Sequence, residues 1–150
     1  MLFDALGNFC GSSGQAITAS AASTEYVDLG ATGTPAPGHT TALKRDIGRG
    51  NPVNIRVQVT EAFATLTSLK VAVQTDDNSS FSSANTVLET EAIAVADLTA
   101  GYVFNLQWIP RNTDERYLRL YFTVAGSSAT TGKIFAGIVE AGQDNDFLAA

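Results

Sequence analysis

The segment VNIRVQV, Val53 to Val59, carries the clearest pattern in the chain. An apolar side chain occupies every second position, and Asn54, Arg56 and Gln58 stand between them. Because successive side chains of a β-strand point to opposite faces, this alternation predicts a strand with one buried face and one face in water.

The same period of two continues on both sides of this segment, and the helical period is almost absent. In Arg116 to Val124 it predicts that Leu118, Leu120 and Phe122 point inward, opposite Tyr117, Arg119 and Tyr121. Together with Val53 to Val59, the stretches expected to form strands are 24–29, 66–75, 85–91, 92–95, 102–109, 116–124 and 132–140. About eight short antiparallel strands predict one all-β domain over residues 1–150, a two-sheet β-sandwich of the jelly-roll type.

The segment from Gly30 to Asn51 interrupts this pattern. It lacks strand periodicity, it is rich in glycine and proline, and connections of this length are usually functional or disordered. Possible anchors for a partner lie along it, and they are His39, Leu43, Lys44, Arg45, Ile47 and Arg49. We interpret 30–51 as an extended loop that becomes ordered on a partner, with a floppy insertion as the alternative.

The two ends of the chain also lie outside the strand pattern. Residues 1–22 are predicted to form an N-terminal arm, and residues 143–150 a C-terminal tail. Phe3, Phe9 and Phe147 would be exposed in a monomer, so we expect them to lie in contacts between protomers or with a partner. Tyr117, Arg119 and Tyr121, on the wet face of their strand, are the other candidate contact residues.

The composition favours a protein that works against other protein surfaces. Charged residues make up 16% of the chain, against ~25% in typical soluble domains. The net charge is −6 and the basic residues are scattered, so we expect no direct binding of nucleic acid. A single cysteine, Cys10, fits a reducing compartment, and the sequence offers neither a signal peptide nor a membrane-spanning run.

Residue types that carry chemistry are scarce. His39, the one histidine, lies in the long loop, where no catalytic base is expected to be ordered. The cluster Asp76-Asp77-Asn78 lacks the spacing of a calcium loop and is expected to form a turn. We therefore expect no enzymatic activity, no metal site and no cofactor.

The aromatic residues of the segment from Tyr102 to Ile109 allow two interpretations. Tyr102, Phe104 and Trp108 share one face of the expected strand, which predicts that they lie in the core. The alternative is a stacking platform for a sugar, as in a carbohydrate-binding module.

In order and texture, the chain resembles the jelly-roll capsid cement, or decoration, proteins of short-tailed bacteriophages. The blocks that carry the resemblance are TEYVDLG, DIGRGNPVNIRVQVTEAF, LKVAVQTDDNSSFSSANTVLET, LTAGYVFNLQWIP and ERYLRLYFTVAGSSATTGKIFAGIV, followed by Gln143-Asp144. None of these blocks is a short catalytic motif.

The resemblance implies a structural virion protein, made in the host cytoplasm and bound to the outer surface of the capsid. Such a protein bridges neighbouring subunits of the major capsid protein and stabilises the expanded shell. It implies a homo-oligomer, for which we favour a trimer over a dimer. The competing expectation is a carbohydrate-binding or receptor-binding β-sandwich module of a phage particle.

Overall fold

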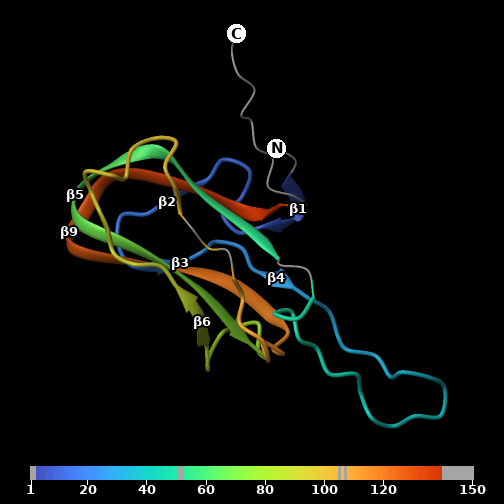
Figure 1. Cartoon of the computed structure of the whole chain (residues 1–150). Coiled ribbons are helices and arrows are strands. Elements are labelled where there is room, and N and C mark those ends of the chain that lie inside the picture. The colour runs from blue at the N-terminus through green and yellow to red at the C-terminus, as the bar shows by residue number, and fades with distance from the viewer. Residues whose placement is uncertain (1–2, 51–52, 105, 107, 140–150) are drawn as a thin grey trace.

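Two 23-residue strands, β5 (Asn54–Asp76) and β9 (Tyr117–Val139), build the fold. They pair antiparallel along their whole length, with Asn54 opposite Val139 and Asp76 opposite Tyr117. The computed structural model describes residues 3–50, 53–104, 106 and 108–139, and within these residues the chain is all-β, with no helix (Figure 1). The sequence-based expectation of an antiparallel all-β chain is confirmed.

Seven shorter strands of the described residues widen this ribbon on its two sides. The strands that pair with β9 are β1 (Phe3–Asn8), β2 (Gln15–Ala16), β3 (Ala21–Ala22) and β4 (Val27–Asp28). Those that pair with β5 are β6 (Asn85–Glu89), β7 (Ile93–Ala94) and β8 (Val103–Phe104). All of these pairings are antiparallel.

The ribbon bends sharply near its middle. The register between β5 and β9 shifts repeatedly between Val59 and Ser68, and the backbone has positive φ at Thr65, Gly126 and Gly132. Bulges of this kind bend a strand without ending its pairing. The sheet therefore curls over on itself (Figure 1), and side chains from both halves of the ribbon form one hydrophobic core.

The predicted alternation agrees with the burial of side chains. Val57 and Val59 in the first half of β5, and Val71 and Val73 in the second, have no exposed surface. The inward residues predicted for the first half of β9 are equally buried, and they are Leu118, Leu120 and Phe122. The period of two therefore identifies the core face in both halves of the ribbon.

The predicted number of strands is wrong at the bend. Val53 to Val59 and Leu66 to Thr75 were expected as two strands, but all of these residues except Val53 belong to the single strand β5. Likewise, β9 runs through Gly126-Ser127-Ser128, which was expected to end a strand. Glycine and serine usually indicate a turn between strands. Here Gly126-Ser127-Ser128 lies at a bulged bend, where the strand changes direction but its pairing continues.

The N-terminal segment belongs to the sheet in its described part. β1, β2 and β3 pair with β9, so residues 3–22 do not form the separate arm that was expected. The ring of Phe9 is 0% exposed, and its amide donates to the carbonyl of Ala136 at 2.9 Å. The expectation that Phe9 is exposed is wrong, because a residue between two strands can fill the core without showing strand periodicity.

Asp76 ends β5 and organises the turn that follows it. Its side chain is buried and accepts hydrogen bonds from the amides of Asn78, at 2.8 Å, and Ser83, at 2.7 Å. The Ser83 hydroxyl also donates to this carboxylate. These bonds favour the ionised form, so the pKa of Asp76 lies below its ordinary value. The turn predicted from the Asp76-Asp77-Asn78 cluster is confirmed.

The substitution Gly132→Ala should destabilise the bend. Gly132 has φ +135°, and an added Cβ would overlap the ring of Phe63. We expect the free energy of unfolding to fall by about 2 to 4 kcal/mol, from strain and overpacking together. Gly101→Ala is the matched control, because Gly101 has φ +97° but open space around it. Urea titration should give a smaller loss there, of about 1 kcal/mol; equal losses would contradict a steric role for Phe63.

The substitution Asp76→Asn should lower stability at neutral pH and flatten the acid side of the pH profile. Because the folded-state pKa is depressed, the carboxylate stabilises the fold above its ordinary pKa of 3.8, and this stabilisation is lost as the pH falls through the folded value. Melting temperatures of wild type and variant should therefore converge toward acid pH. Asp77→Asn, on the exposed side of the same turn, removes the same charge and serves as control. A gap that stays constant with pH would contradict the role of Asp76.

Candidate partner-binding surface

The segment between β4 and β5 projects from the sheet as a long loop, which we call the arm (residues 30–50 of the described chain; Figure 1). Residues 31–44 are all exposed, and no strand forms among them. The amide of Leu43 donates to the carbonyl of Gly33 at 2.7 Å, so the two limbs of the arm lie together at this point. The far part of the arm therefore makes no contact with the hydrophobic core, and its surface is available to a partner.

The arm root, Arg45 to Gly48, is fixed to the turn that precedes β9. Arg45 donates to the carbonyls of Leu29 and Gly30, and more weakly to that of Glu115 at 3.4 Å. Asp46 accepts from the amides of Gly48, at 3.1 Å, and Asn112, at 3.0 Å.

Two further contacts complete the arm root. The amide of Ile47 donates to the carbonyl of Thr113 at 3.1 Å. Gly48 packs so closely on the backbone of Pro110 that a Cβ at this position would overlap the Pro110 carbonyl. The arm is therefore held by backbone contacts at its root.

The structure separates the predicted arm residues into two groups. Arg45 and Ile47 serve the fold, because Arg45 holds the root and Ile47 packs against the core. His39, Leu43 and Arg49 are exposed, and Leu43 is 52% exposed. Lys44, also exposed, lies 3.6 Å from the carboxylate of Asp114, in a surface ion pair that contributes little stability.

Beside the arm root lies a group of rings and guanidinium groups, which we call the aromatic–arginine cluster (Tyr26, Phe81, Arg116, Tyr117 and Arg119). The Arg119 guanidinium carbon lies 4.2 Å from the centre of the Phe81 ring. The ring of Tyr26 meets Phe81 edge to face at 5.9 Å and Tyr117 at 5.6 Å. Tyrosine and arginine are, with tryptophan, the residue types enriched among the energetic centres of protein interfaces.

The fold positions this cluster from three separate segments. The turn capped by Asp76 presents Phe81, which has φ +53° and is largely buried. β9 presents Tyr117 and Arg119 on its outer face, and β4 follows Tyr26 and pairs with β9. Tyr121, on the same face of β9, is half-buried opposite Ala22 and Ala72.

One arginine of the cluster is neutralised within the chain. Arg116 binds the carboxylate of Asp28 through two contacts of 2.7 Å, and it also lies over the ring of Tyr117. This pairing lowers the pKa of Asp28 to about 2. The pair is exposed, so it orients the start of β9 more than it stabilises the fold.

Trp108 was missed as a surface residue. The strand pattern placed it in the core with Phe104, but Phe104 is 2% exposed while Trp108 is 73% exposed. β8 ends at Phe104, so the strand parity that predicted burial does not extend to residue 108. The nearby Pro110, which stops a strand, was the signal that could have indicated this.

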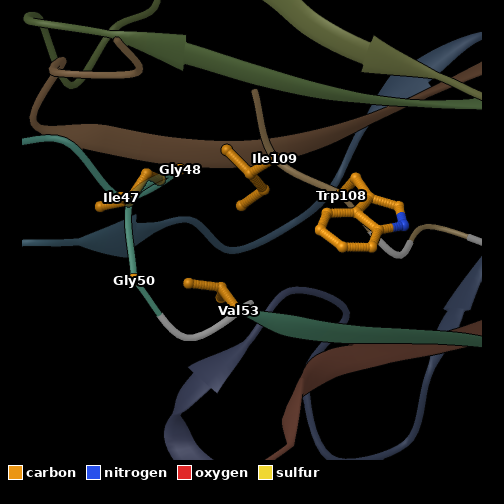
Figure 2. Close-up of a pocket in the computed structure, with 6 residues that line it drawn as sticks. All are labelled: Ile47, Gly48, Gly50, Val53, Trp108 and Ile109. Atoms are coloured by element: carbon orange, nitrogen blue, oxygen red, sulfur yellow. The ribbon is translucent and has the colours of Figure 1, made fainter. Parts of the chain in front are cut away.

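Trp108 borders a small apolar hollow at the arm root, lined also by Ile47, Gly48, Gly50, Val53 and Ile109. Figure 2 shows the indole on one side of this hollow and Ile47 on the other. An exposed tryptophan beside apolar side chains is typical of a contact surface for a protein or a sugar.

The described residues hold neither a group of metal ligands nor an ionised thiol. Among them, no group of three or more His, Cys, Asp or Glu could hold a metal ion. Burial raises the pKa of the Cys10 thiol to about 12, so it is not a thiolate at neutral pH. None of the described residues belongs to a helix with the length and apolar character of a membrane span.

The remaining predicted contact residues cannot be placed on this surface. Phe147 and the tail 143–150 lie outside the described residues. Phe3 is in β1, opposite Val139, but its side chain is outside the described part of the chain. Both residues therefore remain predictions.

Comparison with known proteins gave one match at the level of families. No curated protein matched the chain. The family model Bbp16, which carries a phage-related name, matches residues 11–138, a span that includes the arm, the aromatic–arginine cluster and nearly all of both long strands. This chain belongs to the Bbp16 family.

Proposed function

We propose that this chain is a structural virion protein that binds the outer surface of a phage capsid and bridges neighbouring subunits of the major capsid protein. In this role it stabilises the expanded shell and catalyses no reaction. The curled sheet would then be the two-layered core of a jelly roll, with the arm and the aromatic–arginine cluster directed at the capsid. The phage-related name of the family supports a virion protein, and the surface described above supports binding.

The observation that carries the proposal is the arm on its fixed root. Its far part has no role in the core, since residues 31–44 are exposed, whereas Arg45 and Asp46 hold its root against the sheet. A rigid root reduces the entropy lost on binding, and an exposed far part can reach a neighbouring subunit. The aromatic–arginine cluster beside the root supplies a second contact, so that one copy can hold two subunits.

We propose that the protein acts as a homo-oligomer, with a trimer favoured over a dimer. Large apolar side chains are exposed in the single chain at several places, among them Leu6 at 84% and Trp108 at 73%. Burial of such side chains between protomers would remove them from water. Several copies joined in this way would each contribute arms to the same capsid surface, and modest contacts would then add up.

A carbohydrate-binding or receptor-binding module of the particle is the second candidate, and the exposure of Trp108 favours it. Indole rings stack on sugars, and Trp108 lies with Val53 and Ile109 around a hollow in the surface. The cement role predicts many copies over the shell, whereas a receptor-binding role predicts few copies and binding to host glycans.

Particles that carry the protein should release their DNA at a higher temperature than particles stripped of it. Binding to the assembled shell and not to its dissociated subunits stabilises the shell by mass action, and it slows rupture. DNA release on heating would be followed by dye fluorescence, before and after purified protein is added back. Equal release temperatures over a range of salt would contradict the cement role.

Shortening the arm should separate folding from binding. A variant that replaces residues 34–42 by an Asn-Gly turn keeps the contact between Gly33 and Leu43, and every residue it removes is exposed. Its melting temperature should match wild type, while its affinity for particles should fall about tenfold or more. Trp108→Ala is the parallel variant for the second candidate. Loss of glycan-array binding in Trp108→Ala, with full particle binding by the short arm, would favour the glycan module.

A further inference from the structure

Arg119 has donors that the described chain does not use. Its Nε donates to Oε1 of Gln74 at 2.9 Å, and its guanidinium stacks on Phe81. Among the described residues, no hydrogen bond or ion pair engages its two terminal nitrogens, and neither nitrogen is sealed inside the protein. The edge of the guanidinium that binds two oxygens at once is therefore open.

Among the described residues, Arg119 also has no carboxylate in direct contact as an ion pair. Its neighbour Arg116 is neutralised by Asp28, as described above. The charge of Asp76 acts on Arg119 without a direct contact, since its two oxygens accept hydrogen bonds from Asn78 and Ser83 in the turn that it caps. In the aromatic–arginine cluster, one arginine is thus paired and the other is not.

The fold holds the Arg119 guanidinium in place before any partner arrives. Gln74 holds its Nε, and the Phe81 ring lies against the guanidinium group. Burial lowers the pKa of Arg119, because the guanidinium has lost part of its hydration. An anion bound to the guanidinium would replace the favourable interactions with water that were lost. An ordered guanidinium loses little further entropy when it forms a pair of parallel hydrogen bonds.

We propose that Arg119 binds a carboxylate of the partner protein, an Asp or Glu side chain, through its two terminal nitrogens. The site rests on the proposed function, because the partner is the capsid subunit. Phe81 covers one side of the guanidinium and excludes water there, which strengthens a charge-assisted pair. A phosphate polymer is the weaker match, since the net charge is −6 and the other cations are scattered, so a nucleic acid backbone would be repelled.

The first test compares the binding of three variants to purified particles. Arg119→Gln should weaken binding about tenfold or more, and Arg119→Lys, which keeps the charge but loses the bidentate geometry, should weaken it less. Lys133→Gln is the control, because Lys133 is an exposed cation at the bend of the ribbon, away from the arm and the aromatic–arginine cluster, and it should change binding less than about twofold. Melting temperatures would be measured for each variant.

A second variant keeps the test informative should Arg119→Gln be unstable. Gln74→Leu leaves the charge of Arg119 in place but removes the partner of its Nε. The guanidinium is then less ordered, and we expect binding to weaken a few-fold.

Carbodiimide coupling identifies the chemistry of the partner group. In Arg119→Lys bound to particles, a water-soluble carbodiimide activates a nearby carboxyl group. The amine at position 119 then displaces the activating group, so that an amide bond forms and the carbodiimide leaves as a urea. Mass spectrometry should find this position joined to one Asp or Glu of the capsid protein.

The outcomes separate this inference from the proposed function. If the wild-type protein does not bind particles, both the proposed function and the inference that Arg119 binds a capsid carboxylate are wrong. If wild type binds but Arg119→Gln binds equally well, or Lys133→Gln weakens binding as much, the inference alone is overturned. Absence of an amide to Asp or Glu, or Arg119-dependent binding to bare DNA, also overturns it.

Discussion

The pairing of β5 with β9 is the constraint on which the rest of the structure depends. The two strands remain hydrogen-bonded from Asn54–Val139 at one end to Asp76–Tyr117 at the other, through a bend that the bulges near Thr65 and Gly126 allow. Every shorter strand of the described residues pairs with one of these two strands. The curl of this one ribbon creates the core, since its two halves supply the side chains that pack against each other.

The sequence predicts the faces of the sheet better than it predicts the strands. Alternation identifies Val57, Val71 and Leu120 as core residues because a period of two depends only on local geometry. The ends of a strand depend on long-range pairing. The sequence around Gly126 therefore predicts the end of a strand, although β9 continues past this residue. The burial of Phe9 also depends on long-range structure, since it follows from the path of the chain between β1 and β2. Alternation therefore could not predict it.

The candidate surface was predicted in part. Alternation placed Tyr117 and Arg119 on the outer face of their strand, and the lack of periodicity marked the arm. Their neighbours could not be predicted. Phe81 reaches Arg119 because Asp76 caps the turn that carries Phe81, and Tyr26 lies just before β4, a strand of two residues. The sequence also could not show which arm residues serve the fold. Arg45 does so through the turn before β9, which is 70 residues away in the sequence.

The root of the arm has a mechanical consequence. Arg45 and Ile47 bind the carbonyls of Glu115 and Thr113, so a pull on the arm passes directly into the turn that begins β9. The side chain of Glu115 accepts a hydrogen bond from Thr75, at the end of β5, so the same force is shared by both long strands. The arm is therefore anchored where the end of β5 and the start of β9 meet, so a load on its far end reaches both long strands.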